Sequence, residues 1–254
     1  MSAHAFRRLI TPVLAATLAL AAACSDQKPQ AGAFTPVPVT PVLGDVPIGN
    51  ADAPVTMIEY AALTCSHCRD FWKWELPKLK AQYIDTGKVR LIYRDFPIDN
   101  GGVGLLFASV ARCGGEAKYV DMVDEFFTRQ YDLLKGAQEG NALPVLNEIG
   151  QKFGVTPEQI MTCIDHQPEL KASILKAQAD GSAKGVRATP TIFINDEVVA
   201  DPTWENVVAA IEKKLGNSAP AAAGTTSAPT TPTTPAPTPP APAAGATPPA
   251  TPPS

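Results

Sequence analysis

Cys65 and Cys68 are separated only by Ser66 and His67, a spacing that allows two thiols to form and break a disulfide. If the motif opens a helix, the free backbone N–H groups and the helix dipole at that end favour a thiolate at Cys65. Cys68 then lies three residues later on the same helix face, within reach of Cys65. His67 can add positive charge or a hydrogen bond. The motif therefore predicts thiol–disulfide exchange, with Cys65 as nucleophile, Cys68 as resolving thiol and His67 tuning Cys65.

Two other kinds of site use the same spacing. A structural zinc site needs four ligands, usually two such pairs, but the other cysteines here are isolated and the other two histidines are distant in sequence. We therefore expect no metal and no cofactor. A purely structural disulfide between Cys65 and Cys68 is also compatible with the spacing. Such a disulfide would not need to lie where a strand passes into a helix, so it leaves the predicted position of the motif unexplained.

The residues around the motif predict a strand before it and a helix after it. A β-branched and apolar run follows Pro54, and the segment after the cysteines has helical character with an early aromatic cluster. The predicted order is β-α-β, then several helices, then β-β-α, which is an α/β fold. The predicted strands are 55–60, 89–93, 191–194 and 198–199, with a turn at Asn195-Asp196-Glu197 between the last two. The predicted helical regions are 64–86, 103–184 and 206–215.

The passage from the strand ending at Tyr60 through Ala61-Ala62-Leu63-Thr64 into Cys65-Ser66-His67-Cys68 resembles the thioredoxin superfamily. The helical insertion between the second strand and the returning sheet resembles the DsbA-type thiol:disulfide oxidoreductases, as do segments 95–97 and 188–195. This resemblance implies a thioredoxin fold over 44–216 with a helical insertion domain over about 101–184. Family members often have proline where this chain has Ser66, a difference that bears on the redox potential.

The same resemblance gives roles to residues outside the motif. It implies that Thr189-Pro190 has a cis peptide bond, lies against the active-site cysteines and binds the substrate peptide. It also implies a structural disulfide between Cys113 and Cys163, as some DsbA-like proteins possess. The alternative for that pair is two buried free cysteines that behave as small apolar residues.

The N-terminus has the order of a secretory signal peptide over residues 1–23. Arg7 and Arg8 precede an apolar run that is too short to span a bilayer and that ends in small residues. Cys24 follows Ala23 in a context that resembles the lipobox of bacterial lipoproteins, which implies lipidation of Cys24 and a membrane anchor. Ordinary signal peptidase cleavage is the alternative. Both routes lead to a periplasmic or other extracytoplasmic compartment, where disulfides persist.

The rest of the chain outside the catalytic region is rich in proline. Residues 24–43 predict a flexible linker, and residues 217–254, which contain no charged side chain, predict a disordered Pro/Ala/Thr-rich tail. The formal net charge of −4 and the absence of long basic runs give no electrostatic reason to bind nucleic acid.

Glu59 and the aromatic residues near the motif are less informative. Acidic residues near a thioredoxin-like pair of cysteines can shuttle protons, but Glu59 could equally cap the edge of the sheet, and no catalytic role is predicted for it. Phe71, Trp72 and Trp74 could form a peptide-binding surface. We expect at least two of the three to lie in the core.

These features together predict an exported protein disulfide oxidoreductase that forms disulfides in secreted proteins. Its expected partners are unfolded or reduced secreted proteins with cysteines and a membrane redox partner that reoxidises it. One alternative is a disulfide isomerase or reductase of the same fold. Another is a lipid-anchored, non-catalytic binding or scaffolding protein, which the proline-rich tail motivates.

Overall fold

The computed structural model describes residues 34–99 and 102–217. The predicted signal peptide, Cys24 and residues 218–254 of the predicted tail lie outside this part of the chain. The fold divides into two compact units. The sheet unit comprises residues 45–98 and the described residues from 177 onward. The helical unit comprises the described residues up to 44 and those between 99 and 176. Among the described residues, no helix has the length and apolar character needed to cross a bilayer.

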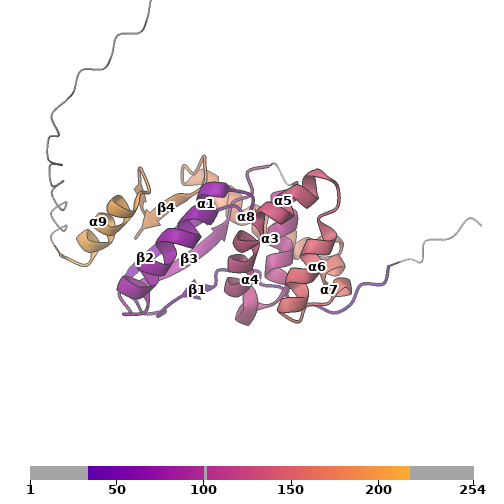
Figure 1. Ribbon diagram of the computed structural model, residues 1–254. Coiled ribbons are helices and arrows are strands. Elements are labelled where there is room, and N and C mark those ends of the chain that lie inside the picture. The colour runs from indigo at the N-terminus through magenta and orange to yellow at the C-terminus, as the bar shows by residue number, and fades with distance from the viewer. Residues whose placement is uncertain (1–33, 100–101, 218–254) are drawn as a thin grey trace, which may run out of the picture. The chain divides into compact units, whose positions relative to one another are not determined.

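The sheet unit contains one five-stranded mixed sheet in the order β1-β3-β2-β4-β5 (Figure 1). Strands β2 and β3 run parallel, with Glu59 opposite Tyr93, while β4 pairs antiparallel with the other side of β2. The α/β thioredoxin-like fold is therefore confirmed. The strands are β1 (Pro47–Ile48), β2 (Val55–Ala61), β3 (Val89–Asp95), β4 (Thr191–Ile194) and β5 (Glu197–Val199). The short strand β1 is the one that the sequence does not predict.

The hairpin between β4 and β5 forms where the sequence predicts a turn. Asn195 and Asp196 connect the two strands, and both have positive φ, 44° and 68°. A two-residue loop with both residues in this region matches the right-handed twist of the strands that it joins, and asparagine and aspartate tolerate the conformation better than most residues.

The helix after β2 is irregular. It begins with α1 (Ser66–Asp70), continues through a π-helical segment η1 (Phe71–Glu75), α2 (Leu76–Leu79) and a second π-helical segment η2 (Lys80–Ile84). The two π-helical segments flank the turn that contains Pro77. Because proline has no N–H to donate, the regular hydrogen-bond pattern is broken at this point of the helix.

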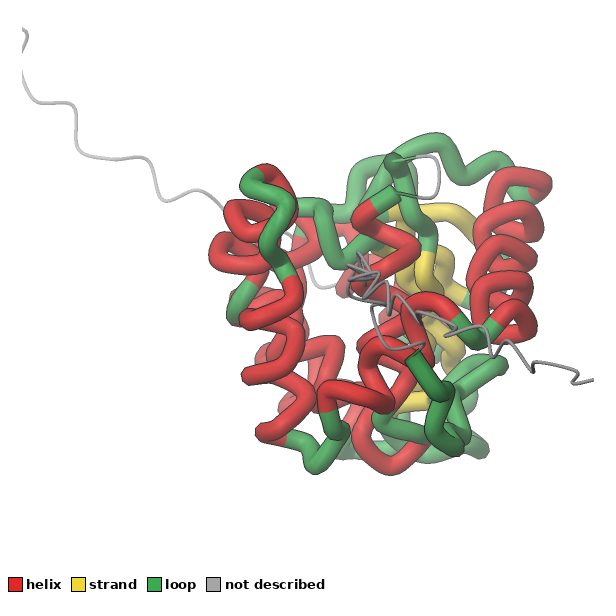
Figure 2. Tube along the Cα trace, turned by 90° about the vertical axis from the view of Figure 1, so that its right-hand side faces the viewer, coloured by secondary structure: helices red, strands yellow, loops and turns green. Residues whose placement is uncertain are grey.

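Aromatic side chains pack on one face of the sheet. Tyr60 makes edge-to-face contacts with Phe96 and Phe193, with ring centroids 6.1 and 5.7 Å apart. Gly181, in the C-terminal part of α8 (Pro168–Ala183), lies against these rings, and a Cβ there would come within 2.7 Å of the Tyr60 ring. The last helix, α9 (Trp204–Lys214), contacts β4 and β5. Within the sheet unit, Figure 2 shows the strands as a single layer.

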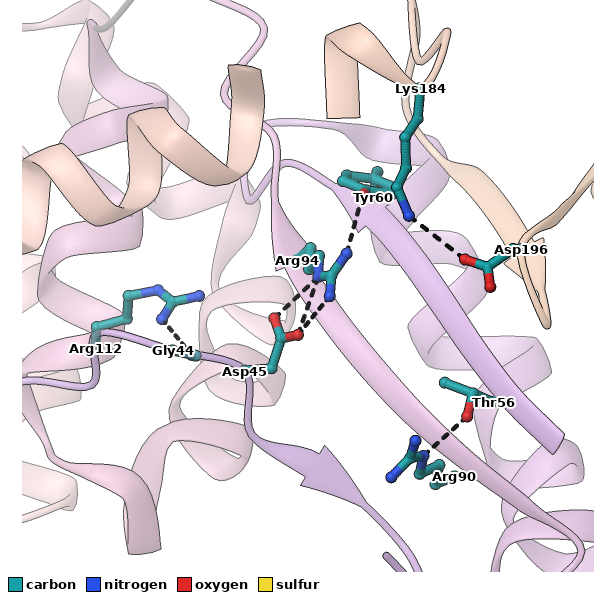
Figure 3. A network of polar contacts seen from close by, with 9 residues as sticks. All are labelled: Gly44, Asp45, Thr56, Tyr60, Arg90, Arg94, Arg112, Lys184 and Asp196. Atoms are coloured by element: carbon teal, nitrogen blue, oxygen red, sulfur yellow. Dashed lines mark hydrogen bonds and ion pairs between the residues drawn. The ribbon is translucent and has the colours of Figure 1, made fainter. Parts of the chain in front are cut away.

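An ion pair fixes the start of the sheet unit. Arg94 on β3 donates to both carboxylate oxygens of Asp45 and, through Nη1, to the Tyr60 hydroxyl at 3.0 Å (Figure 3). Such a two-pronged guanidinium–carboxylate contact is stronger than a single surface ion pair. It holds the chain that leads into β1 against the sheet.

The helical unit consists of α3 to α7 and the first part of α8. A disulfide between Cys113, at the end of α3, and Cys163, on α7, joins two of its helices, with Cα atoms 6.0 Å apart. A capping box at Thr156 and Gln159 opens α7. The helices are α3 (Val103–Cys113), α4 (Glu116–Thr128), α5 (Gln130–Gln138), α6 (Leu143–Lys152) and α7 (Pro157–Asp165).

Residues 34–43, the described part of the predicted linker, contain neither helix nor strand. They are nevertheless attached to the helical unit. Phe34 stacks on His166 with ring centroids 5.4 Å apart, the Val37 N–H donates to the Thr162 hydroxyl at 3.1 Å, and Val42 donates to the Arg112 carbonyl at 3.0 Å.

Candidate active site

Cys65 is the N-cap of α1. Its Sγ accepts a hydrogen bond from the backbone N–H of Cys68 at 3.3 Å, and its own N–H donates to the Ala62 carbonyl at 2.9 Å. The turn that follows β2 thus places the sulfur where the unsatisfied N–H groups of the helix point. Both cysteines are free thiols in this structure. Cys65 is 7% exposed and Cys68 is fully buried.

The surroundings of Cys65 stabilise its thiolate. The hydrogen bond from the Cys68 side chain has the largest effect, and the Thr189 side chain and the backbone N–H groups of Cys68 and His67 add to it. Burial opposes these contributions, but together they lower the pKa of Cys65 from 9.0 to about 5. The group is therefore ionised at neutral pH and is both a nucleophile and a good leaving group.

Cys68 is shifted in the opposite direction. Burial has the largest effect, and the hydrogen bond that it donates to Cys65 and the nearby charge of Glu59 act in the same direction, so that the pKa of Cys68 lies well above its usual range. One thiol is thus prepared for attack, whereas the other holds its proton until a base removes it. This asymmetry is what a nucleophilic and a resolving cysteine require.

The loop before β4 lies against Cys65. The Thr189–Pro190 peptide bond is cis, and the Thr189 carbonyl lies 3.4 Å from the Cys65 sulfur, which donates to it as a thiol. The structure therefore brings together Cys65, Cys68, Thr189 and Pro190 from separate parts of the sequence. Sequence spacing alone gives no indication of this contact.

His67 occupies a different position from the thiols. It is exposed, and it influences Cys65 through its backbone N–H. Its side chain lines a groove of about 430 Å³ together with Pro190 and several side chains from η1 and the start of α9. The rest of the lining is three acidic residues, three aromatic residues, a proline and a threonine: Asp70, Glu75, Asp201, Phe71, Trp74, Trp204, Pro202 and Thr203.

Glu59 is the residue that sequence reasoning set aside. Its carboxylate is fully buried, and Trp72 Nε1 donates to Oε2 at 2.8 Å. Burial raises the pKa of Glu59 from 4.5 to about 8; the Trp72 hydrogen bond lowers this pKa and the charge of Cys65 raises it. The alternative that Glu59 caps the sheet edge is wrong, because β2 lies between β3 and β4. The available signal was an acidic residue within an otherwise buried apolar strand.

The aromatic cluster after the motif divides as expected. Phe71 and Trp72 are buried, at 6% and 3% exposure, whereas Trp74 is 60% exposed. Two of the three residues belong to the core, and the third is available on the groove beside the thiols.

Within the described ranges, no group of three or more histidine, cysteine or acidic side chains is arranged to hold a metal ion.

A family model described as thioredoxin matches residues 42–213, most of the chain and nearly all of the described part. The chain belongs to this family. The match includes both cysteines of the motif, the helical unit and the loop with the cis peptide bond.

The named proteins and solved structures to which the chain is similar include protein-disulfide oxidoreductases and DsbA proteins. The chain is 29% identical to a putative protein-disulfide oxidoreductase of Rickettsia bellii, over 76% of this chain and 73% of the relative, and 28% identical to that of Rickettsia prowazekii, over 67% and 61%. The chain thus spans less than two thirds of the second relative's length. Among solved structures, α-DsbA1 of Wolbachia pipientis has a TM-score of 0.60 at 28% identity, covering 69% of this chain and 93% of that one. BdbD of Bacillus subtilis, at 22% identity and a TM-score of 0.60, covers 72% and 99% and shares the fold.

Proposed function

We propose that this protein is an exported, DsbA-like thiol:disulfide oxidoreductase that introduces disulfides into secreted proteins through Cys65 and Cys68. The observation that carries the proposal is the opposite behaviour of the two thiols, one ionised and one protonated, beside a cis-proline loop. The relatives named as protein-disulfide oxidoreductases and as disulfide bond formation protein D support the same reaction.

The oxidising reaction transfers two electrons from the substrate to the Cys65–Cys68 disulfide. A substrate thiolate attacks Cys65, which forms a mixed disulfide and releases Cys68 as a thiolate that takes up a proton. A second substrate thiolate then attacks the substrate sulfur of the mixed disulfide, so that the substrate disulfide forms and Cys65 leaves as a thiolate. A low pKa at Cys65 makes this departure easy and stabilises the reduced protein, which favours oxidation of the substrate.

Glu59 fits the role of proton exchange partner for Cys68. Because its pKa is about 8, the carboxyl group changes protonation state close to neutral pH, and it lies near enough for its charge to act on Cys68. The backbone at Thr189-Pro190 would pair with the substrate chain, and the groove beside His67 would receive its neighbouring side chains.

We further propose that the protein acts in the periplasm or another extracytoplasmic space. The resemblance of residues 1–23 to a secretory signal peptide supports export, and the sequence around Cys24 supports lipidation and attachment to a bacterial membrane. A membrane redox partner would return Cys65 and Cys68 to the disulfide state after each reaction. The reaction takes reduced secreted proteins as substrates. Because it consumes the Cys65–Cys68 disulfide, it also requires a partner that restores this disulfide.

A reduced, unfolded protein that has native disulfides tests the function. The oxidised chain is expected to restore its activity, and Cys65→Ala is expected to abolish the reaction. Cys68→Ala is expected to trap the disulfide-bonded form of the same substrate, because its Cys65 thiolate attacks the substrate disulfide, forms a mixed disulfide and releases one substrate thiolate, and no second thiol resolves the complex. Full activity of the Cys65→Ala variant, or the absence of trapped complexes in Cys68→Ala, would refute the assignment. Circular dichroism confirms that each variant is folded.

A further inference from the structure

The indole of Trp72 is fixed in the core, on the irregular helix that begins at the thiols. It lies on η1, four residues after Cys68, is 3% exposed and packs edge-to-face on Tyr93 with ring centroids 5.5 Å apart. Its Nε1 points at Oε2 of Glu59, 2.8 Å away. A buried indole with an edge-to-face neighbour has little freedom to turn, so the hydrogen bond fixes the carboxyl group of Glu59.

The two oxygens of Glu59 have different surroundings. Oε2 accepts from Trp72, whereas Oε1 is buried and has no hydrogen-bond partner in the described part of the chain. A buried oxygen without a partner is costly and is rare in proteins unless it serves a function. Oε1 is therefore the oxygen that is available to take and return a proton.

Few ionisable groups of the neighbouring strands share the face of Glu59, because the cations of β3, Arg90 and Arg94, alternate with Tyr93 and lie on the opposite face of the sheet. Cys65 and Cys68 lie at the start of α1, and on β3 Tyr93 stands opposite Glu59 with Asp95 one position further along the same face. On the other side, β4 contributes Ile192. Since no cation is among these neighbours, the Trp72 N–H is the described donor that favours the ionised form of Glu59.

We propose that Trp72 is a positioning residue for the resolving step: its indole N–H holds Oε2 of Glu59, leaves Oε1 free to exchange a proton with Cys68, and thereby sets the pH range in which Cys68 attacks. This inference rests on the proposed oxidoreductase function. It assigns the pH dependence of that function to a tryptophan that acts through Glu59.

Oxidised glutathione provides a defined reaction in which this step can be observed. The Cys65 thiolate attacks the glutathione disulfide, which forms a protein–glutathione mixed disulfide and releases one glutathione thiolate. Cys68 then gives its proton to Glu59 and attacks the Cys65 sulfur, so that the second glutathione leaves as a thiolate. The protein dithiol loses two electrons, and one glutathione disulfide becomes two glutathione thiols.

The experiment follows the decay of the mixed disulfide by acid quench and mass spectrometry across about pH 5.5 to 9.5. Because the Trp72 hydrogen bond favours the carboxylate, Trp72→Phe is expected to move the rising limb of this decay rate to higher pH by about 1 to 2 units. The first step, attack by Cys65, should keep its own pH profile.

Two further variants separate the hydrogen bond from packing. Tyr83→Phe is the matched control. Tyr83 lies on the same irregular helix as Trp72 and is also an aromatic donor to a glutamate, since its hydroxyl donates to Glu212 on α9 at 2.7 Å. Its pH profile should equal that of the wild type. In a Glu59→Gln background, which has no carboxylate to titrate, adding Trp72→Phe should produce no further shift.

The outcomes are distinct. An unmoved profile in folded Trp72→Phe, or an equal shift with and without Glu59, overturns the positioning role while leaving the oxidoreductase function in place. Failure of the wild-type protein to form the mixed disulfide at all overturns the proposed function itself.

Discussion

Replacing Glu59 by glutamine is expected to remove a large part of the pH dependence of stability. In the folded protein the pKa of Glu59 is about 8, whereas in the unfolded chain it returns to about 4.5, so the folded state binds one more proton between these values. The stability associated with the neutral carboxyl group is complete below about pH 4.5 and is lost as the pH rises towards 8. The slope is about 1.4 kcal/mol for each pH unit.

The magnitude follows from the burial of the side chain, which leaves no solvent to screen it. Between about pH 5 and pH 8, the free energy of unfolding of the wild-type protein should fall relative to Glu59→Gln by about 3 kcal/mol. The constant effects of the substitution, such as the altered hydrogen bond to Trp72, cancel in this comparison because they do not depend on pH.

Urea denaturation of both proteins at several pH values measures the difference. The oxidised form is the suitable sample, because a thiol in a disulfide does not titrate and burial, the main cause of the shift, remains. A stability difference between the two proteins that stays constant from pH 5 to pH 8 would refute the argument that Glu59 is buried as a neutral acid.

Three other predictions test separate parts of the structure. Replacing Cys113 and Cys163 together by alanine should lower the unfolding free energy by about 4 kcal/mol, as expected for a bridge across a separation of 50 residues, while the redox reaction persists; an unchanged urea midpoint would contradict this. Gly181→Ala should cost about 1 to 3 kcal/mol and lower Tm, because its Cβ would overlap the Tyr60 ring, and an unaltered Tm would show that the ring yields freely. Thr189→Val should raise the pKa of the nucleophilic thiol in a thiolate absorbance titration; an unshifted titration would exclude a contribution from this side chain.

Much of the fold could be predicted because its signals are local. The apolar run after Pro54, the position of Cys65 at a helix start and the Asn195-Asp196 turn each depend on neighbouring residues, and the structure has the corresponding strand, cap and hairpin. Strand β1 has two residues and exists only through its pairing with β3, so no local pattern marks it.

The active site was only partly predictable for the same reason. The motif identifies Cys65 and Cys68, and the resemblance to DsbA-type proteins points to Thr189-Pro190. The role of Glu59 depends on the position of β2 in the middle of the sheet and on the side to which its side chain points. Its contact with Trp72 requires the fold of the irregular helix, which periodicity does not specify.

The most direct test of the account is the redox potential of the Cys65–Cys68 pair, measured by equilibration with glutathione buffers and quantification of the oxidised fraction. The stabilised thiolate of Cys65 makes the reduced form favourable, so the account predicts an oxidising potential, above about −180 mV. A potential near −270 mV, typical of a reducing thioredoxin, would contradict the claim that this site donates its disulfide to secreted proteins.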